Sequence, residues 1–151
     1  MSQITNDSEF MKTIESLDYT QQRVVAGLLV KNVIDLCDDE RITRVADVAA
    51  NPGASDDELA AALKTARATT IDCHTRCGSE GDWKAQAGYF VARAATAAVT
   101  PKAQSKAGGP AWQAAMSSRM ARTSMQIDAE DVSTSDESGQ QYKVLSDYLN
   151  S

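Results

Sequence analysis

Apolar residues recur at intervals of three and four positions through most of this chain, and alanine supplies many of them. The clearest such segment begins at Ser55, which has the spacing of a capping box with Glu58, and ends at Gly78, a favourable left-handed C-cap. Aromatic residues make up only 5% of the chain, whereas strands favour β-branched and aromatic residues. Few segments alternate apolar and polar positions over a strand's length. The pattern predicts an all-α fold.

Caps and breaks divide the 151 residues into five to seven helices joined by short loops. We expect helices over residues 8–17, 21–37, 38–50, 55–77, 83–99, 111–127 and 140–149. Ser8 and Thr20 are the expected N-caps of the first two. Short loops between helices predict a compact bundle with mostly antiparallel neighbours, and the length suits one domain spanning residues 1–151.

The helix faces predict which side chains form the core. Trp83 and Trp112, each near a helix start, are expected to anchor the core, and Met120 is expected on the inner side of its helix. Residues 128–139 are acidic and rich in Ser and Thr, which predicts an exposed, flexible linker to a short C-terminal helix.

Neither a membrane span nor a secretory signal is visible. No apolar run approaches the roughly 18 residues that a spanning helix needs, and the N-terminus is polar and acidic. The cysteines are three, Cys37, Cys73 and Cys77, an odd number without an export signal. These features predict a cytoplasmic protein with free thiols.

Charge is unevenly distributed along the chain. Residues 1–82 carry 8 basic and 15 acidic side chains, residues 83–127 carry six basic and no acidic ones, and residues 128–151 carry one basic and six acidic. The acidic parts can pack against the basic helical pair, or an acidic surface can attract a basic protein partner. The third reading is an anion or nucleic-acid site on the basic pair. Six dispersed charges without interleaved aromatic residues disfavour nucleic acid.

The carboxylates that best fit a partner-binding surface lie close together in sequence. They are Asp35, Asp38, Asp39, Glu40 and Asp47. Opposite potentials speed encounter and exclude wrong partners, so we expect these residues to contact a basic protein.

One cluster, Cys73-His74-Thr75-Arg76-Cys77, suggests chemistry. On a helix Cys73 and Cys77 are one turn apart with His74 beside them, and Cys37 offers a fourth zinc ligand. The usual two-residue cysteine spacing is missing, however, so we interpret the cysteines as small core residues without metal. A thiol paired with the only histidine is the reactive alternative. No phosphate-binding glycine loop or nucleophile elbow occurs, and we predict no cofactor.

Four helical segments together resemble a family of known proteins. They are Arg23-Val24-Val25-Ala26 leading to Asp38-Asp39-Glu40-Arg41, Asp57-Glu58-Leu59-Ala60-Ala61-Ala62, Ala92-Arg93-Ala94-Ala95, and Pro110-Ala111-Trp112-Gln113-Ala114-Ala115. Over roughly residues 20–125 the chain resembles all-helical immunity proteins of bacterial polymorphic toxin systems. The resemblance implies a cytoplasmic bacterial protein that neutralises a cognate toxin by binding it, without catalysis.

The favoured interpretation is therefore a non-catalytic protein-binding module. The alternative is a small-ligand-binding protein or small enzyme with a pocket between alanine-rich helices near Cys73, His74 and Cys77. A third possibility is a homo-oligomer that assembles through the last helix.

Overall fold

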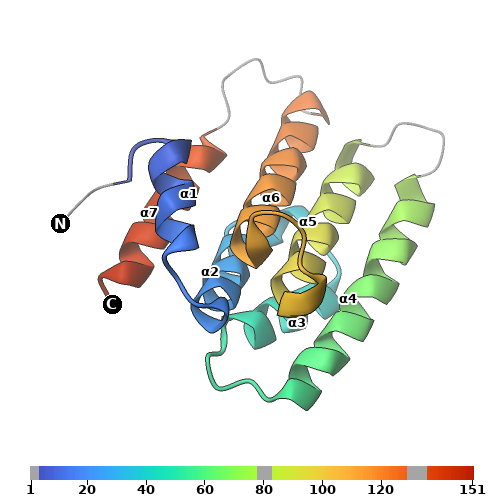
Figure 1. Ribbon diagram of the computed structural model, residues 1–151. Helices are drawn as coiled ribbons and strands as arrows, with labels where there is room; N and C mark the ends of the chain where they lie inside the picture. Colours follow the sequence, from blue (N-terminus) through green and yellow to red (C-terminus); the bar gives the residue numbers. More distant parts are fainter. Residues whose placement is uncertain (1–3, 78–82, 129–135) are drawn as a thin grey trace.

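The computed structural model describes residues 4–77, 83–128 and 136–151, and these ranges contain seven α-helices, two 3-10 helices and no strand (Figure 1). The α-helices are α1 (Asp7–Glu15), α2 (Tyr19–Lys31), α3 (Glu40–Ala50), α4 (Asp56–Cys77), α5 (Trp83–Val99), α6 (Gly109–Asp128) and α7 (Glu137–Leu149). The 3-10 helices are η1 (Ile34–Leu36) and η2 (Lys102–Gln104). The predicted all-α class is confirmed.

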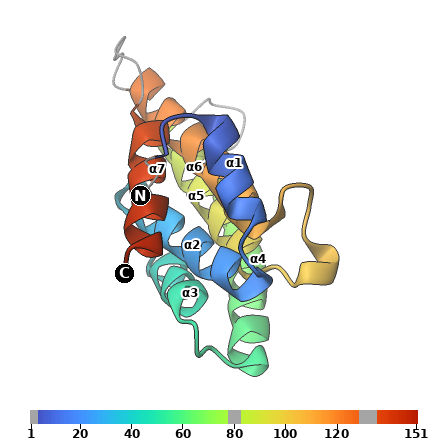
Figure 2. The same cartoon turned by 60° about the vertical axis from the view of Figure 1, so that its left-hand side comes forward.

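The central helix of the bundle is α5, which packs between α4 and α6. These three helices run antiparallel side by side, and α2 and α3 lie behind them (Figure 1). Helices α1 and α7 pack against each other and against α6 at one side of the bundle, as both views show (Figures 1 and 2). Over the outward side of α4, α5 and α6 the described residues place the short η2 and its flanking loops, and no further α-helix (Figures 1 and 2).

Small side chains let the helices approach closely. Both helices of the closely packed α5–α6 pair contribute fully buried alanines to the core, among them Ala94, Ala95 and Ala98 of α5 and Ala114 and Ala115 of α6. A Cβ atom built on Gly27 of α2 would lie 2.6 Å from the backbone nitrogen of Ala50, so α2 and α3 meet at a glycine. Larger side chains complete the core elsewhere: Phe10, Ile14, Leu29, Ile42 and Leu145.

The capping prediction holds at one helix and fails at two. Ser55 and Glu58 form the expected capping box of α4, with the Glu58 amide donating to Ser55 Oγ at 3.1 Å. The N-cap of α1, however, is Asn6 rather than Ser8, and that of α2 is Asp18 rather than Thr20. Both helices begin earlier than predicted because Asn6 and Asp18 have extended backbones and side-chain oxygens that accept from the first helical turn. Each lies two residues before the serine or threonine that was expected to be the cap.

Helix α2 ends at Lys31, not at residue 37. Asn32 is its C-cap, and after Val33 the chain tightens into η1 and turns toward α3. The continuous apolar pattern of residues 24–37 did not reveal this change of direction. The helix prediction for residues 83–99 is confirmed, whereas Gly78, the predicted C-cap of α4, lies outside the described residues.

Three expectations about burial are wrong. Met120 is 49% exposed and Trp83 is 38% exposed, so neither is a core residue. Glu137 belongs to the predicted linker, but it is the first residue of α7 and only 1% exposed. Residues 129–135 of that linker lie outside the described residues. Among the described helices, none is both long and apolar enough to span a membrane.

Candidate functional site

The predicted acidic surface divides into exposed and paired carboxylates. Asp35, Asp38 and Glu40 are exposed at the turn that carries η1 and the start of α3. Asp47 is two turns along α3 and forms an ion pair with Lys31 at 3.0 Å. The structure therefore groups three of the five predicted carboxylates at one corner, which we call the acidic corner (Asp35, Asp38 and Glu40).

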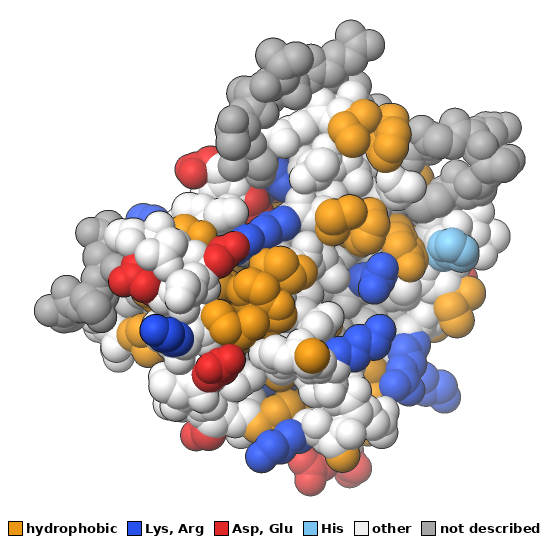
Figure 3. All heavy atoms as spheres, turned by 45° about the horizontal axis from the view of Figure 1, so that its top comes forward, with side chains coloured by type: hydrophobic (Ala, Val, Ile, Leu, Met, Phe, Trp, Pro, Cys, Tyr) orange, Lys and Arg blue, Asp and Glu red, His pale blue; other side chains and the backbone are white. Residues whose placement is uncertain are grey.

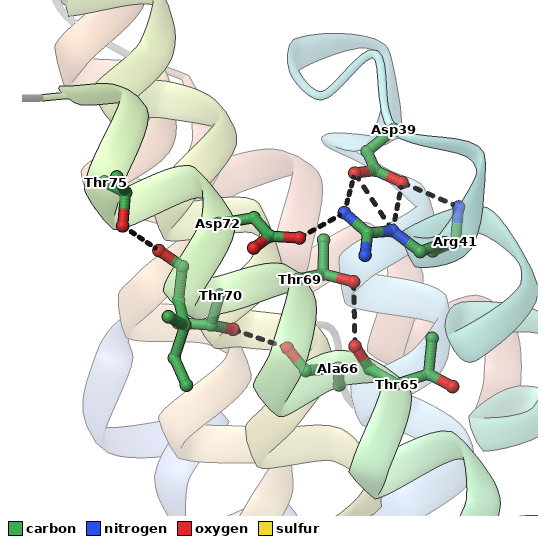
Figure 4. Close-up of polar contacts among 9 residues, drawn as sticks. Asp39, Arg41, Thr65, Ala66, Thr69, Thr70, Asp72 and Thr75 are labelled. Carbon is green, nitrogen blue, oxygen red and sulfur yellow. Dashed lines mark hydrogen bonds and ion pairs between the residues drawn. The ribbon is translucent and has the colours of Figure 1, made fainter.

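Asp39 has a structural role instead. Its carboxylate caps α3 by accepting from the Arg41 amide at 3.0 Å, and it also binds the Arg41 guanidinium at 2.7 Å. That guanidinium reaches Asp72 of α4 at 3.0 Å, so the three side chains join α3 to α4 (Figure 4). The hydrogen bonds that Arg41 donates, chiefly to Asp39 and then to Asp72, raise the pKa of its guanidinium, which stays charged.

Of the predicted Cys73, His74 and Cys77 cluster, the two side chains that the structure describes do not share a pocket. Cys73 is buried and lines a cavity of about 550 Å³ together with Cys37 and Asp38, whereas His74 is exposed and faces Tyr89, with ring centres 5.4 Å apart. Burial is the main reason that the pKa of the Cys37 thiol is raised. The Cys77 side chain lies outside the described part, and the described residues hold no group of three potential metal ligands.

Two arginines of the basic segment are bound by acidic side chains from distant parts of the chain. Arg119 of α6 donates two hydrogen bonds to Asp7 of α1, at 2.7 and 2.9 Å. This contact is the main reason that the pKa of Asp7 falls to about 2. Arg122 pairs with the buried Glu137 of α7 at 3.2 Å. The intramolecular interpretation of the charge layout is therefore confirmed for these two arginines.

Other basic side chains gather around a cavity of about 460 Å³ between α4, α5, η2 and the start of α6. Arg67 comes from α4, Arg93 from α5, and Lys106 from the loop that precedes α6. No carboxylate lines the cavity within the described residues. In the same ranges, neither Arg93 nor Lys106 forms an ion pair with a carboxylate. We call this space the basic cavity.

Aromatic and apolar side chains border the basic cavity. The Arg93 guanidinium lies 5.7 Å from the centre of the Tyr89 ring and 5.9 Å from that of Phe90. These cation–π contacts hold a long side chain in place without neutralising its charge. Ile71 also lines the cavity and is 67% exposed.

The deeper wall carries hydroxyl groups that are already engaged as donors. Thr96 Oγ1 donates to Ala92 O at 2.9 Å, and Thr100 Oγ1 donates to Thr96 O at 2.7 Å. Thr70 Oγ1 has a backbone carbonyl at 2.7 Å and lies 3.1 Å from Thr96 Oγ1. Because a hydroxyl has a single hydrogen, these oxygens remain available chiefly as acceptors.

Apolar exposure continues from the cavity along α6. Ser117 lines the cavity, Met120 follows Ser117 by three residues, and Ile127 follows Met120 by seven, spacings that keep one side of a helix. Met120 and Ile127 are 49% and 45% exposed. We call the surface formed by Arg67, Ile71, Tyr89, Phe90, Arg93, Ser117, Met120 and Ile127 the α4–α6 face. In Figure 3, basic side chains gather beside and below the pale blue histidine, and hydrophobic ones are exposed above them.

The sequence indicates only part of this surface, since an anion site on the basic pair was one of three readings of the charge layout and Arg67 was not included in it. Arg67 belongs to the acidic half of the chain, and only packing of α4 on α5 brings it near Arg93. The signal that was present is the absence of acids between residues 83 and 127. Comparison with known proteins adds no relative, since no protein-family model, no curated protein and no solved structure matches the chain. The fold thus defines a compact all-helical protein.

Proposed function

We propose that this chain is a non-catalytic protein-binding module and that the α4–α6 face is its main contact surface. The observation that carries the proposal is the exposure of large apolar side chains on one face: Ile71 lines the cavity beside the stacked arginine, and Met120 and Ile127 lie beyond it along α6. Ile71, Met120 and Ile127 are each at least 45% exposed. Grouped apolar exposure of this kind is typical of interaction sites, and Tyr, Met and Arg are enriched at protein interfaces.

The acidic corner supports a second contact with the same partner. Asp35, Asp38 and Glu40 are exposed and can attract a basic region of that partner, which would affect mainly the association rate. Asp39 and Asp47 are less suited to this role because Arg41 and Lys31 already bind them. A charge-reversal experiment should therefore change Asp38 and Glu40 and leave Asp39 intact.

Toxin neutralisation is the specific form of this function that the resemblance to helical immunity proteins suggests. Its test is co-expression of this chain with the product of each neighbouring gene that arrests growth. Rescue by the wild-type chain, lost on Ile71→Asp with Met120→Asp, supports neutralisation through the α4–α6 face. Rescue that persists in a folded double variant places the contact elsewhere.

The contact surface itself is tested by site-specific photo-crosslinking in native cells. A benzophenone side chain replaces Ile71 on the α4–α6 face, Asp38 at the acidic corner, or Leu149, which is 46% exposed on α7. We expect one discrete heterologous adduct from position 71 and none from position 149. An adduct of the chain with itself from position 149 would instead indicate a homo-oligomer through the last helix. Absence of an adduct from position 71 contradicts the proposal and favours the small-ligand alternative.

A further inference from the structure

We propose that the basic cavity binds an acidic segment of a protein partner. The inference rests on the proposed protein-binding function and specifies the kind of partner segment that binds at the α4–α6 face. The occupant is an extended stretch of chain in which two or three Asp or Glu residues flank an apolar side chain.

The rim of the cavity supplies the positive charge. Arg67, Arg93 and Lys106 come from three different elements and are all exposed. No carboxylate of the described residues lines the cavity. Arg67 donates to Gln104, a neutral partner, at 3.3 Å. The positive charge of these side chains is therefore not balanced by a carboxylate of the described residues. Because the three side chains come from different elements, they suit several carboxylates spaced along a peptide.

The deeper wall distinguishes a peptide from a free anion. The hydroxyl groups of Thr96 and Thr100 donate to backbone carbonyls, so their oxygens are available to an occupant as acceptors. Inorganic phosphate carries mainly acceptor oxygens and would meet acceptors there. A peptide presents backbone N–H donors to the threonines while its side-chain carboxylates face the cationic rim.

The size and the apolar lining agree with this occupant. The volume of about 460 Å³ lies within the range of sites that enclose small ligands. Ile71, Tyr89 and Ala97 provide the apolar part of the cavity lining. An apolar side chain placed between carboxylates would fill that part of the cavity.

The test is selection of random twelve-residue peptides displayed on phage, with the intact wild-type chain as bait. We expect the enriched peptides to be rich in Asp and Glu around one apolar residue. The affinity of a synthetic copy of the most enriched peptide should fall at least about tenfold on Arg67→Glu with Arg93→Glu, because two attractive contacts become repulsive. The same titration with inorganic phosphate should show no saturable binding.

The matched control is Lys12→Glu with Lys143→Glu, which changes the net charge equally on α1 and α7, away from the cavity. The control should bind the peptide within about twofold of wild type. Three results overturn the inference: enrichment of neutral or basic peptides, equal loss of binding in both double variants, or no enrichment. A crosslinked partner whose contact segment at position 71 is not acidic would also refute it while leaving the proposed function intact.

Discussion

Replacing Glu137 with alanine should destabilise the protein strongly, although Glu137 belongs to a polar segment of the sequence. Its side chain is 1% exposed, and its contacts within the described residues include partners from α6 and from the end of α2. Arg122 of α6 donates to one oxygen at 3.2 Å, and Asn32 at the end of α2 donates to the other at 2.9 Å. One side chain therefore joins α7 to both α6 and α2.

The magnitude follows from the ion pair and its burial. At 3.2 Å and an effective dielectric constant of about 20, the Coulomb attraction is about 5 kcal/mol. Desolvation of the pair offsets much of this attraction, and the Arg122 side chain is 25% exposed and can turn toward water. Removing one member of a fully buried pair costs about 3–5 kcal/mol, so we expect about 2–4 kcal/mol for Glu137→Ala. Glu137→Gln keeps an acceptor for Asn32 and should cost about half as much.

The assay is urea and thermal unfolding followed by circular dichroism. A loss of about 2–4 kcal/mol corresponds to a melting temperature roughly 5–15 °C lower for a chain of this size. Hydrogen exchange should show α7 opening first, because its attachment is what the substitution removes. The control is Asp147→Ala, which removes an exposed carboxylate of the same helix that pairs with the exposed Lys143 and should cost less than about 0.5 kcal/mol. If Glu137→Ala and Asp147→Ala are equally stable, the buried pair does not hold α7.

Three other predictions concern close packing, pH and the thiols. Gly27→Ala should lower the free energy of unfolding by about 1–3 kcal/mol in urea titrations, because its Cβ would lie 2.6 Å from a backbone nitrogen. The control is Gly53→Ala, which should cost much less because its Cβ would have an ordinary 3.5 Å contact. The pKa of Asp7 falls from 3.8 to about 2 on folding, so its stabilising contribution is present above pH 4 and is lost as the pH falls toward 2. The side chain is 49% exposed, so solvent screening keeps this contribution below about 1 kcal/mol, and acid titration of Asp7→Asn should lack it. Cys37 and Cys73 should remain reduced, and metal analysis of protein purified without chelators should find less than stoichiometric zinc. Cys37 should react slowly with iodoacetamide at pH 7 because burial raises its thiol pKa. One zinc ion that disappears on Cys73→Ser would contradict the structural interpretation of the cysteines.

Local signals in the sequence determined the helices. The Ser55–Glu58 capping box and the helix break at residues 51–53 depend on interactions within a few residues, so the sequence alone predicts them. The inward positions Ile42 and Ala49 of α3 were likewise readable from helical spacing, and both are fully buried. Where the prediction of a boundary failed, as at Lys31, the apolar pattern continued through a bend into η1, which packs against α5 and α6.

Tertiary structure alone decided the electrostatics and the candidate surface. Asp39 looked like its acidic neighbours, but Arg41 and Asp72 give it a structural role across two helices. Arg67 lay in an acidic half of the sequence and became part of a cationic rim when α4 packed on α5. A helical pattern shows which side of a helix is apolar, whereas pairing of charges depends on which helices become neighbours. That choice is made by packing between segments far apart in the chain, and no local pattern encodes it.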